Sequence, residues 1–323
     1  MRTFLKYPGG KTKELDIINQ NKPIVIKRYF EPFLGGGSVF FDLEIANSFI
    51  NDKSEDLMAL FAFVKAKDET FLELLSKTNE IWKNLSVENW GKVDFSYLVD
   101  DSEIFEFYAN VKLETEKRRI QKSENSEDTN FDTALIEITS IKTAFYSTIR
   151  KIYNTSSPKT VVRTVCYYFL REFCYSSMFR FSSIGDFNVP YGGQSYNEKN
   201  FDTKIELITQ YSMNKTKIYN EDFEVFLKRF TFNRNDFVFV DPPYDSEFSD
   251  YDGNEFDKDK QIILANMLSR IPANIMVVIK NTEFIYDLYS ELGFKISSFD
   301  KKYSVNFQNR NCRDVKHLLI TNY

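Results

Sequence analysis

Residues 237–244 read FVFVDPPY, and this stretch decides the fold class. The apolar run predicts a buried strand at 236–240, and the abrupt change to Asp241-Pro242-Pro243-Tyr244 predicts a stiff loop at its carboxyl end. The other strands that the sequence predicts are 24–34, 47–51 and 275–280. Strands that alternate with helical stretches in this way are typical of an α/β sheet.

A second stretch, EPFLGGGS at 31–38, follows the first predicted strand. Glycines permit a positive φ and a close approach of ligand to backbone, and open α/β sheets bind nucleotides at such carboxyl ends. Asp52 lies 17 residues after Gly35, near the spacing at which an acid takes the ribose hydroxyls. The pattern favours an adenosine-bearing cofactor. The alternative is a tight turn and a surface aspartate with no ligand, which would have the same residues.

The GGKT at residues 9–12 has the ending of a phosphate-binding loop. Leu5 stands where that motif requires its first glycine, which argues against a P-loop ATPase.

Residues 57–201 lack the strand–helix rhythm and predict a domain inserted into an α/β domain made of 1–56 and 202–323. The residues at 54–77 have helical spacing, and those at 115–130 (TEKRRIQKSENSEDTN) are the most loop-like. The tail predicts two strands joined by a loop, a terminal hairpin.

The 323 residues carry a net charge of −5, which is unusual for a nucleic-acid protein, so local charge matters more. Residues 142–180 hold seven basic residues and one acid, a local charge of +6 that would suit one face on DNA or a set of solvated helix faces. No apolar run reaches the length of a membrane span, and MRTFLKYPGGK lacks the apolar region of a signal peptide. We therefore expect neither a membrane segment nor a leader.

Three widely spaced cysteines indicate reduced thiols and a cytoplasmic location rather than a disulfide framework. No His/Cys zinc spacing occurs, so a zinc-dependent base deaminase is excluded and no metal is expected.

The DPPY residues suit one kind of reaction. An amine conjugated to a nucleobase is a poor nucleophile, and two acceptors, the Asp241 carboxylate and the Pro242 carbonyl, would hold its hydrogens and free its lone pair. The ring of Tyr244 would stack on a flipped-out base. Adenine N6 and cytosine N4 both meet this description.

With these motifs the chain resembles Dam-type N6-adenine DNA methyltransferases, the D12 class and α group, nearly end to end. The resemblance implies a Rossmann-like methyltransferase sheet with an antiparallel last strand and an inserted, mainly helical target-recognition domain with a β-hairpin. It implies S-adenosylmethionine as methyl donor and double-stranded DNA as substrate, in a restriction-modification or epigenetic role. A companion restriction endonuclease is a further expectation.

The resemblance also assigns residues. The catalytic residues would be Asp241, Pro242, Pro243 and Tyr244. The cofactor contacts would be Tyr7, Gly10, Lys11, Phe33, Gly35, Gly37, Ser38, Asp52, Asp222 and Phe223. CYSSMFRFSSIGDFNVPYGG at 174–193 is similar to the family's DNA-reading hairpin, which gives the DNA contacts Tyr175, Met178, Arg180 and Pro190. Lys6, outside this hairpin, matches a second position of the family that contacts bases, and is the fifth DNA contact that the resemblance implies.

The chain also departs from the family pattern. Members that read GATC usually carry asparagine where Ser176 and Ser182 stand, and an aromatic residue near Gln194. The recognition site therefore stays open. Cytosine N4 methylation and a DNA-binding relative without catalysis are the alternative functions.

Overall fold

The computed structural model describes residues 3–124, 133–243, 256–302 and 314–323. Two compact units divide the chain. The sheet unit comprises Met1–Thr3, Gly9–Ser54 and Met213–Tyr323, and the helical unit comprises Phe4–Pro8 and Glu55–Ser212. Tyr244, one of the predicted catalytic residues, lies outside the described residues.

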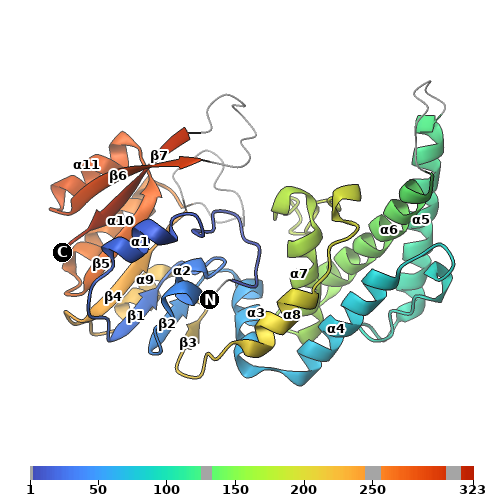
Figure 1. The fold of residues 1–323 in the computed structure, drawn as a ribbon, viewed down its shortest axis with the longest axis horizontal. Coiled ribbons are helices and arrows are strands. Elements are labelled where there is room, and N and C mark those ends of the chain that lie inside the picture. Colours follow the sequence, from blue (N-terminus) through green and yellow to red (C-terminus); the bar gives the residue numbers. More distant parts are fainter. Residues whose placement is uncertain (1–2, 125–132, 244–255, 303–313) are drawn as a thin grey trace. The chain divides into compact units, whose positions relative to one another are not determined.

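The sheet unit is built on a seven-stranded sheet with the order β3-β2-β1-β4-β5-β7-β6 (Figure 1). The strands are β1 (Arg28–Glu31), β2 (Ser48–Asn51), β3 (Lys217–Tyr219), β4 (Asp236–Val240), β5 (Asn274–Lys280), β6 (Lys295–Lys302) and β7 (Asp314–Thr321). The first five pair in parallel, and β7 runs antiparallel to both β5 and β6. The predicted methyltransferase-like sheet with its reversed last strand is confirmed.

The strand predictions differ from the structure mainly at their ends. The strand expected at 24–34 is only Arg28–Glu31, because pairing to β4 begins at Arg28 opposite Asp236, and Ile24 and Val25 are exposed. The three residues of β3 were missed, since they contain no apolar run. Strand β4 has the predicted bounds and is wholly buried. Asp241 therefore follows directly after the last buried residue of this strand.

Five helices belong to the part of the sheet unit that the structure describes. They are α1 (Leu15–Asn21), α2 (Ser38–Leu43), α9 (Phe223–Lys228), α10 (Lys258–Arg270) and α11 (Glu283–Glu291). Helices α1 and α2 pack together, as do α10 and α11 (Figure 1). Aromatic rings fill much of the core, where Phe30 of β1 stacks on Phe49 of β2 with centroids 4.7 Å apart.

The helical unit holds six α-helices in its described part. They are α3 (Glu55–Ala66), α4 (Glu69–Asn84), α5 (Ser102–Glu124), α6 (Thr133–Thr155), α7 (Val161–Phe173) and α8 (Asp202–Gln210), with short 3₁₀ turns η1 (Trp90–Lys92), η2 (Tyr175–Ser177) and η3 (Gln194–Tyr196). Its core is aromatic. The indole of Trp82 is completely buried against Phe169, Phe173 and Tyr191. None of the described helices is long and apolar enough to cross a membrane.

Two predictions for this unit were wrong in detail. The helical stretch 54–77 is split between α3 and α4, because Lys67 has φ +50° and the Asp68 carboxylate caps α4 by accepting the N–H of Phe71. Residues 115–124, expected to be a loop, belong to α5. Ion pairs three residues apart on this helix, such as Arg119 with Glu116, give the polar sequence local support.

The basic window at 142–180 does not form one exposed face. Lys142 and Arg171 are buried, and Arg163 pairs with Asp56. The Lys142 ammonium donates to the Asn197 carbonyl, and the guanidinium of Arg171 lies among aromatic rings. Much of this charge therefore holds the unit together and adds to neither of the two arrangements that the sequence left open, one face on DNA or a set of solvated helix faces.

Candidate functional site

The carboxyl ends of β1, β2 and β4 bring three predicted motifs together. These strands are neighbours in the sheet, so the glycine loop after β1, Asp52 after β2 and Asp241 after β4 meet at one edge. Two glycines of the loop, Gly35 and Gly37, have φ of +49° and +68°, values that favour glycine. Gly37 caps α2, which begins at Ser38.

Asp52 is tied to this loop. Its Oδ2 accepts the N–H of Gly35 at 2.9 Å, and its Oδ1 accepts the N–H of Ser54 at 3.0 Å. The side chain is half-buried, so it is fixed in direction yet reachable from solvent. This is the arrangement expected of an acid that holds a ribose next to a glycine turn.

Asn51 is a site residue that the sequence analysis missed. Its buried amide donates to the carbonyls of Pro32 and Glu221, each at 3.0 Å, and its oxygen accepts the N–H of Glu221. One side chain therefore joins the loops after β1 and β3. A polar residue ending an apolar strand was the available signal, but its partner lies 170 residues away.

The loop after β3 carries the predicted Asp222 and Phe223. Asp222 caps α9 by accepting the N–H of Glu224 at 2.9 Å. The rings of Phe223 and Phe33 lie 5.4 Å apart, and Phe256 contacts both at 5.5 Å. Phe256, which the sequence analysis missed, completes an aromatic cluster in which Phe223 and Phe256 are buried and Phe33 is half-buried, so the accessible part of Phe33 could pack on a planar base.

Lys11 ends in an ion pair with the DPPY aspartate. Its Nζ lies 2.5 Å from Oδ2 of Asp241 and also donates to the carbonyl of Gly9 at 3.0 Å. Lys11 is nearly fully buried, whereas 21% of the Asp241 side chain is exposed. The lysine assigned to the cofactor therefore contacts the predicted catalytic carboxylate. Gly10, its neighbour, is exposed.

The two prolines hold different positions. Pro242 is buried and Pro243 is exposed. The amide of Gln261, on α10, donates to the Pro243 carbonyl at 2.9 Å, and Gln261 is itself fully buried. Helix α10 therefore holds the loop through this hydrogen bond. No local sequence pattern indicates the contact.

Glu31 is a buried acid beside these charges. It is 2% exposed, and its Oε2 accepts the hydroxyl of Tyr29 at 2.7 Å. Burial raises the pKa of Glu31 well above its ordinary value, and Asp241 and Asp52 raise this pKa further, while Tyr29 and Lys11 lower it. The carboxyl is therefore neutral over a wider pH range than in the unfolded chain.

This pKa predicts a pH-dependent stability. A folded pKa above the unfolded value means that stability is greatest below about pH 4.5 and is lost as the pH rises toward the folded pKa. Glu31→Gln keeps an acceptor for Tyr29 but cannot ionise. The free energy of unfolding of the variant, relative to that of the wild type, should therefore be larger at pH 8 than at pH 4.5. Urea unfolding of both proteins at pH 4.5 and pH 8 measures these free energies. Glu291→Gln, at an exposed position, is the control and should show no such dependence on pH. The prediction is refuted if the difference between Glu31→Gln and the wild type is the same at both pH values.

The predicted DNA-reading segment forms a hairpin in the helical unit. Antiparallel bridges join Cys174 to Tyr191 and Phe181 to Phe187, and the turn includes Gly185 at φ +84°. Phe179 and Phe187 are buried and stack at 4.3 Å. Buried rings thus alternate with outward-pointing residues, as expected where one face of a hairpin packs on a core.

The exposed face of this hairpin carries most of the predicted DNA contacts. Tyr175, Arg180 and Pro190 are exposed, and Met178 is half-buried. Nε of Arg180 donates to Oδ1 of Asn188 at 3.2 Å, so Asn188, also exposed, orients the guanidinium. The sequence analysis missed Asn188, although it lies between two buried residues of the alternating pattern.

The other two predicted residues, Lys6 and Tyr7, belong to the helical unit. The N–H of Lys6 is accepted by Glu172 at 3.1 Å. The guanidinium of Arg171 lies 4.5 Å from the ring of Tyr7 and 3.8 Å from that of Phe179. Tyr7 is thereby grouped with the hairpin, apart from the other predicted cofactor residues, which lie in the sheet unit.

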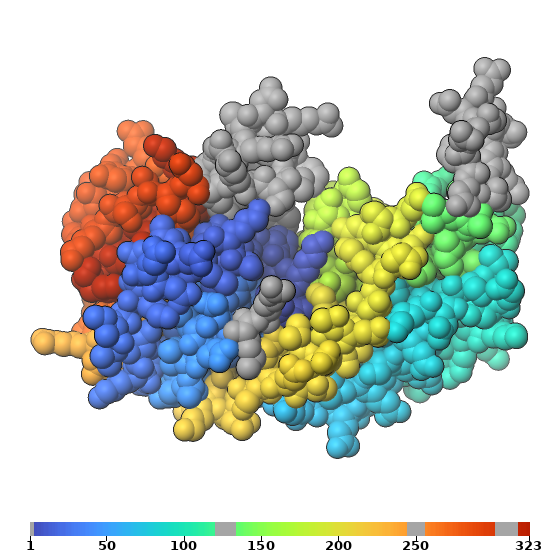
Figure 2. Space-filling model, in the orientation of Figure 1, coloured from blue at the N-terminus to red at the C-terminus, as the bar shows by residue number. Residues whose placement is uncertain are grey.

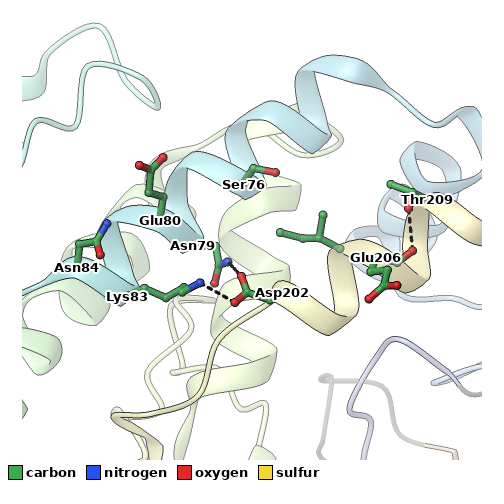
Figure 3. A pocket seen from close by; sticks show the side chains of 9 residues that line it. Ser76, Asn79, Glu80, Lys83, Asn84, Asp202, Glu206 and Thr209 are labelled. Atoms are coloured by element: carbon green, nitrogen blue, oxygen red, sulfur yellow. Dashed lines mark hydrogen bonds and ion pairs between the residues drawn. The ribbon is translucent and has the colours of Figure 1, made fainter.

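A hollow of about 470 Å³ lies between α4 and α8 (Figure 3). No predicted site residue lines it. Its polar groups engage one another, since Asp202 accepts from Asn79 at 2.7 Å and pairs with Lys83 at 2.6 Å. These contacts join the two helices, and we assign the hollow no ligand.

Comparison with known proteins shows to which family the chain belongs. A family model described as D12 class N6 adenine-specific DNA methyltransferase matches residues 7–305. The chain belongs to this family. The D12 match covers both units, including the glycine loop, the hairpin and the DPPY loop.

Curated relatives align over nine tenths or more of their length. Type II methyltransferase M.MjaIII of Methanocaldococcus jannaschii is 28% identical over 340 residues, covering 100% of this chain and 99% of that protein. M.CviBI of Paramecium bursaria Chlorella virus NC1A, also a type II methyltransferase, is 26% identical, covering 100% of both chains. A DNA adenine methylase of Haemophilus influenzae is 24% identical, covering 96% of this chain and 90% of that protein.

The D12 family methylates adenine N6 in DNA, so this chain is an adenine-specific DNA methyltransferase, and cytosine N4 is set aside as the acceptor. D12 enzymes use S-adenosylmethionine. The residues at the sheet edge fit that molecule, since they offer a glycine turn, a fixed carboxylate at Asp52 and the half-buried ring of Phe33, which is backed by the buried ring of Phe223.

Proposed function

We propose that this D12 methyltransferase acts on an adenine flipped out of duplex DNA, with Asp241 and the Pro242 carbonyl as acceptors for the two hydrogens of N6. The observation that carries the proposal is the place of Asp241 at the end of β4, beside the glycine loop and paired with Lys11. Pro242 and Pro243 stiffen the loop, and Tyr244 would stack on the base.

The chain's own residues would do two things. Lys11 and the Gln261 contact to Pro243 hold the acceptors in place, which supports catalysis by positioning and electrostatics. Drawing the amine hydrogens toward two acceptors frees the nitrogen lone pair. S-adenosylmethionine supplies, when bound, a methyl group on a positively charged sulfur.

We assign the donor molecule to the sheet edge. Asp52 would hold the ribose, Asp222 would accept from the exocyclic amine of its adenine, and Phe223 would pack on that ring. The remaining contacts of the sheet unit in this assignment are Gly10, Lys11, Phe33, Gly35, Gly37 and Ser38. Tyr7, which belongs to the helical unit, stays in the assignment only through the resemblance to the family.

The helical unit would recognise the target sequence. The exposed row on its hairpin, Tyr175, Arg180 and Pro190, supports this role, and Lys6 lies in the same unit. Arginine is the commonest reader of guanine, and a tyrosine at the hairpin base suits stacking beside the vacated position. Met178 would add an apolar contact.

We further propose a restriction-modification role with a companion endonuclease, or an epigenetic role, in the cytoplasm. The relatives named type II methyltransferases support the first and the DNA adenine methylases the second. Cys166 and Cys174 are buried free thiols, in keeping with a reducing compartment.

Single-molecule sequencing of DNA from a methylation-free bacterial host that expresses this chain tests the proposal. We expect the kinetic signature of N6-methyladenine at one short motif, which also reveals the recognition site. An absence of modified adenine in the presence of folded protein would refute the proposal, and a titration with S-adenosylmethionine would show whether a DNA-binding relative without catalysis remains.

A further inference from the structure

Two lysines from distant parts of the chain share the ring of Tyr196. Nζ of Lys199 lies 3.4 Å from the ring centroid, and Nζ of Lys6 lies 5.5 Å from it. The electron-rich face of an aromatic ring attracts cations, so one ring here holds two like charges near each other. Neither ammonium forms an ion pair with a carboxylate in the described part of the chain.

The backbone of each lysine is anchored by a buried side chain. The carboxylate of Glu172 accepts the N–H of Lys6 at 3.1 Å. The indole of Trp82 donates to the carbonyl of Lys199 at 2.8 Å. Both anchors belong to the core of the helical unit, so the backbone from which each lysine side chain extends is held in place.

The ring of Tyr196 is also held in place. A Cβ added at Gly192 would lie 2.7 Å from three of its ring atoms, so the glycine lets the ring lie directly on the backbone. Gly192 is the second residue after Pro190, and its N–H donates to the Phe173 carbonyl at 2.9 Å. The cluster therefore begins where the hairpin ends.

The charges of the cluster are not balanced from within. Lys204, the next lysine, is ion-paired with Glu172 at 2.5 Å, which leaves Lys6 and Lys199 to repel each other. Burial lowers the pKa of Lys199, and the charges of Lys6 and Lys204 lower this pKa further, whereas Glu172 and Cys174 raise it; the direction of the shift is downward. An anion placed between the two ammonium groups would relieve that repulsion.

We propose that Lys6, Tyr196 and Lys199 form a binding site for a phosphate group of the DNA backbone next to the bases that the hairpin reads. The inference rests on the proposed role of the helical unit in target recognition. A phosphodiester suits the cluster because it carries one negative charge and because phosphates border every base. The segment with η3 and α8, drawn in yellow, lies at the molecular surface (Figure 2).

The test is the salt dependence of DNA binding by the full chain. Fluorescence anisotropy with a labelled duplex, carrying the site found by sequencing, gives the Kd at several NaCl concentrations. Loss of one phosphate contact should lower the slope of log K against log salt by about 0.9. We expect this for Lys199→Gln, with equal weakening on duplexes with and without the site, because a phosphate carries no sequence information.

Two further variants sharpen the result. Lys77→Gln is the matched control, because Lys77 lies over the ring of Tyr97 at 5.0 Å in the same unit, and it should keep the wild-type slope. Gly192→Ala removes no charge but displaces Tyr196, so it should reduce the slope as Lys199→Gln does.

The outcomes separate this site from the proposed function. If the wild type methylates adenine but Lys199→Gln, folded by circular dichroism, keeps its slope, the phosphate site is refuted and the function stands. If Lys199→Gln weakens only the duplex with the site, Lys199 reads a base and the inference is also wrong. If the wild type binds no duplex, both proposals fail.

Discussion

Replacing Asp241 with alanine is expected to lower the rate of methyl transfer by about 10²–10³-fold or more, the usual cost of removing one preorganised electrostatic partner. The variant takes away the acceptor that ends β4 and leaves Lys11 without its carboxylate. Single-turnover transfer of a labelled methyl group to a duplex with the site measures the rate. DNA binding, followed separately by anisotropy, should stay measurable.

Two comparisons make this result specific. Asp241→Asn keeps the shape and one acceptor oxygen, so it should fall between alanine and the wild type. Glu291→Ala removes an exposed acid from α11 of the same unit and should leave the rate unchanged, since Glu291 is not a predicted site residue. A near-normal rate for Asp241→Ala would refute the proposed mechanism.

Replacing Arg180 with alanine should weaken discrimination between DNA sites by about 1–3 kcal/mol, if the guanidinium makes two hydrogen bonds to a guanine. The side chain is exposed on the hairpin and oriented by Asn188. The measurement compares kcat/KM on the cognate duplex with duplexes changed at one base pair each. The loss should be confined to one position of the motif.

Arg119→Ala serves as the control for this variant. Arg119 is exposed on α5 of the same unit, and its loss removes equal charge without touching the hairpin. It should leave discrimination intact. If Arg180→Ala also discriminates like the wild type at every position, Arg180 does not read a base.

The motifs that could be read from the sequence are those whose residues are neighbours in the chain. FVFVDPPY and EPFLGGGS each carry a strand and its loop together, so β1, β4 and the sheet class followed from them. Both ends of β1 were placed too far out, at 24 and 34 instead of 28 and 31. At the start, Ile24 and Val25 have strand-like side chains but no partner strand.

What the sequence could not give depends on contacts between distant residues. Lys11 meets Asp241 across 230 residues, and Asn51 joins a loop 170 residues away. The charge of Arg171 and Lys142 counted toward a basic face, yet both are buried among rings. A sum of charges along the chain does not tell which of them reach solvent.

The pairing of Lys11 with Asp241 has a consequence for how the enzyme meets its substrate. DNA is a polyanion, and a bare carboxylate beside it would repel every approach at low ionic strength. Because the lysine offsets that charge before DNA arrives, the Asp241 carboxylate adds little net charge to the reactive centre, and a neutral base can enter beside it without any change in the charge of this pair. Attraction of DNA is then left to the lysines and arginines at the surface.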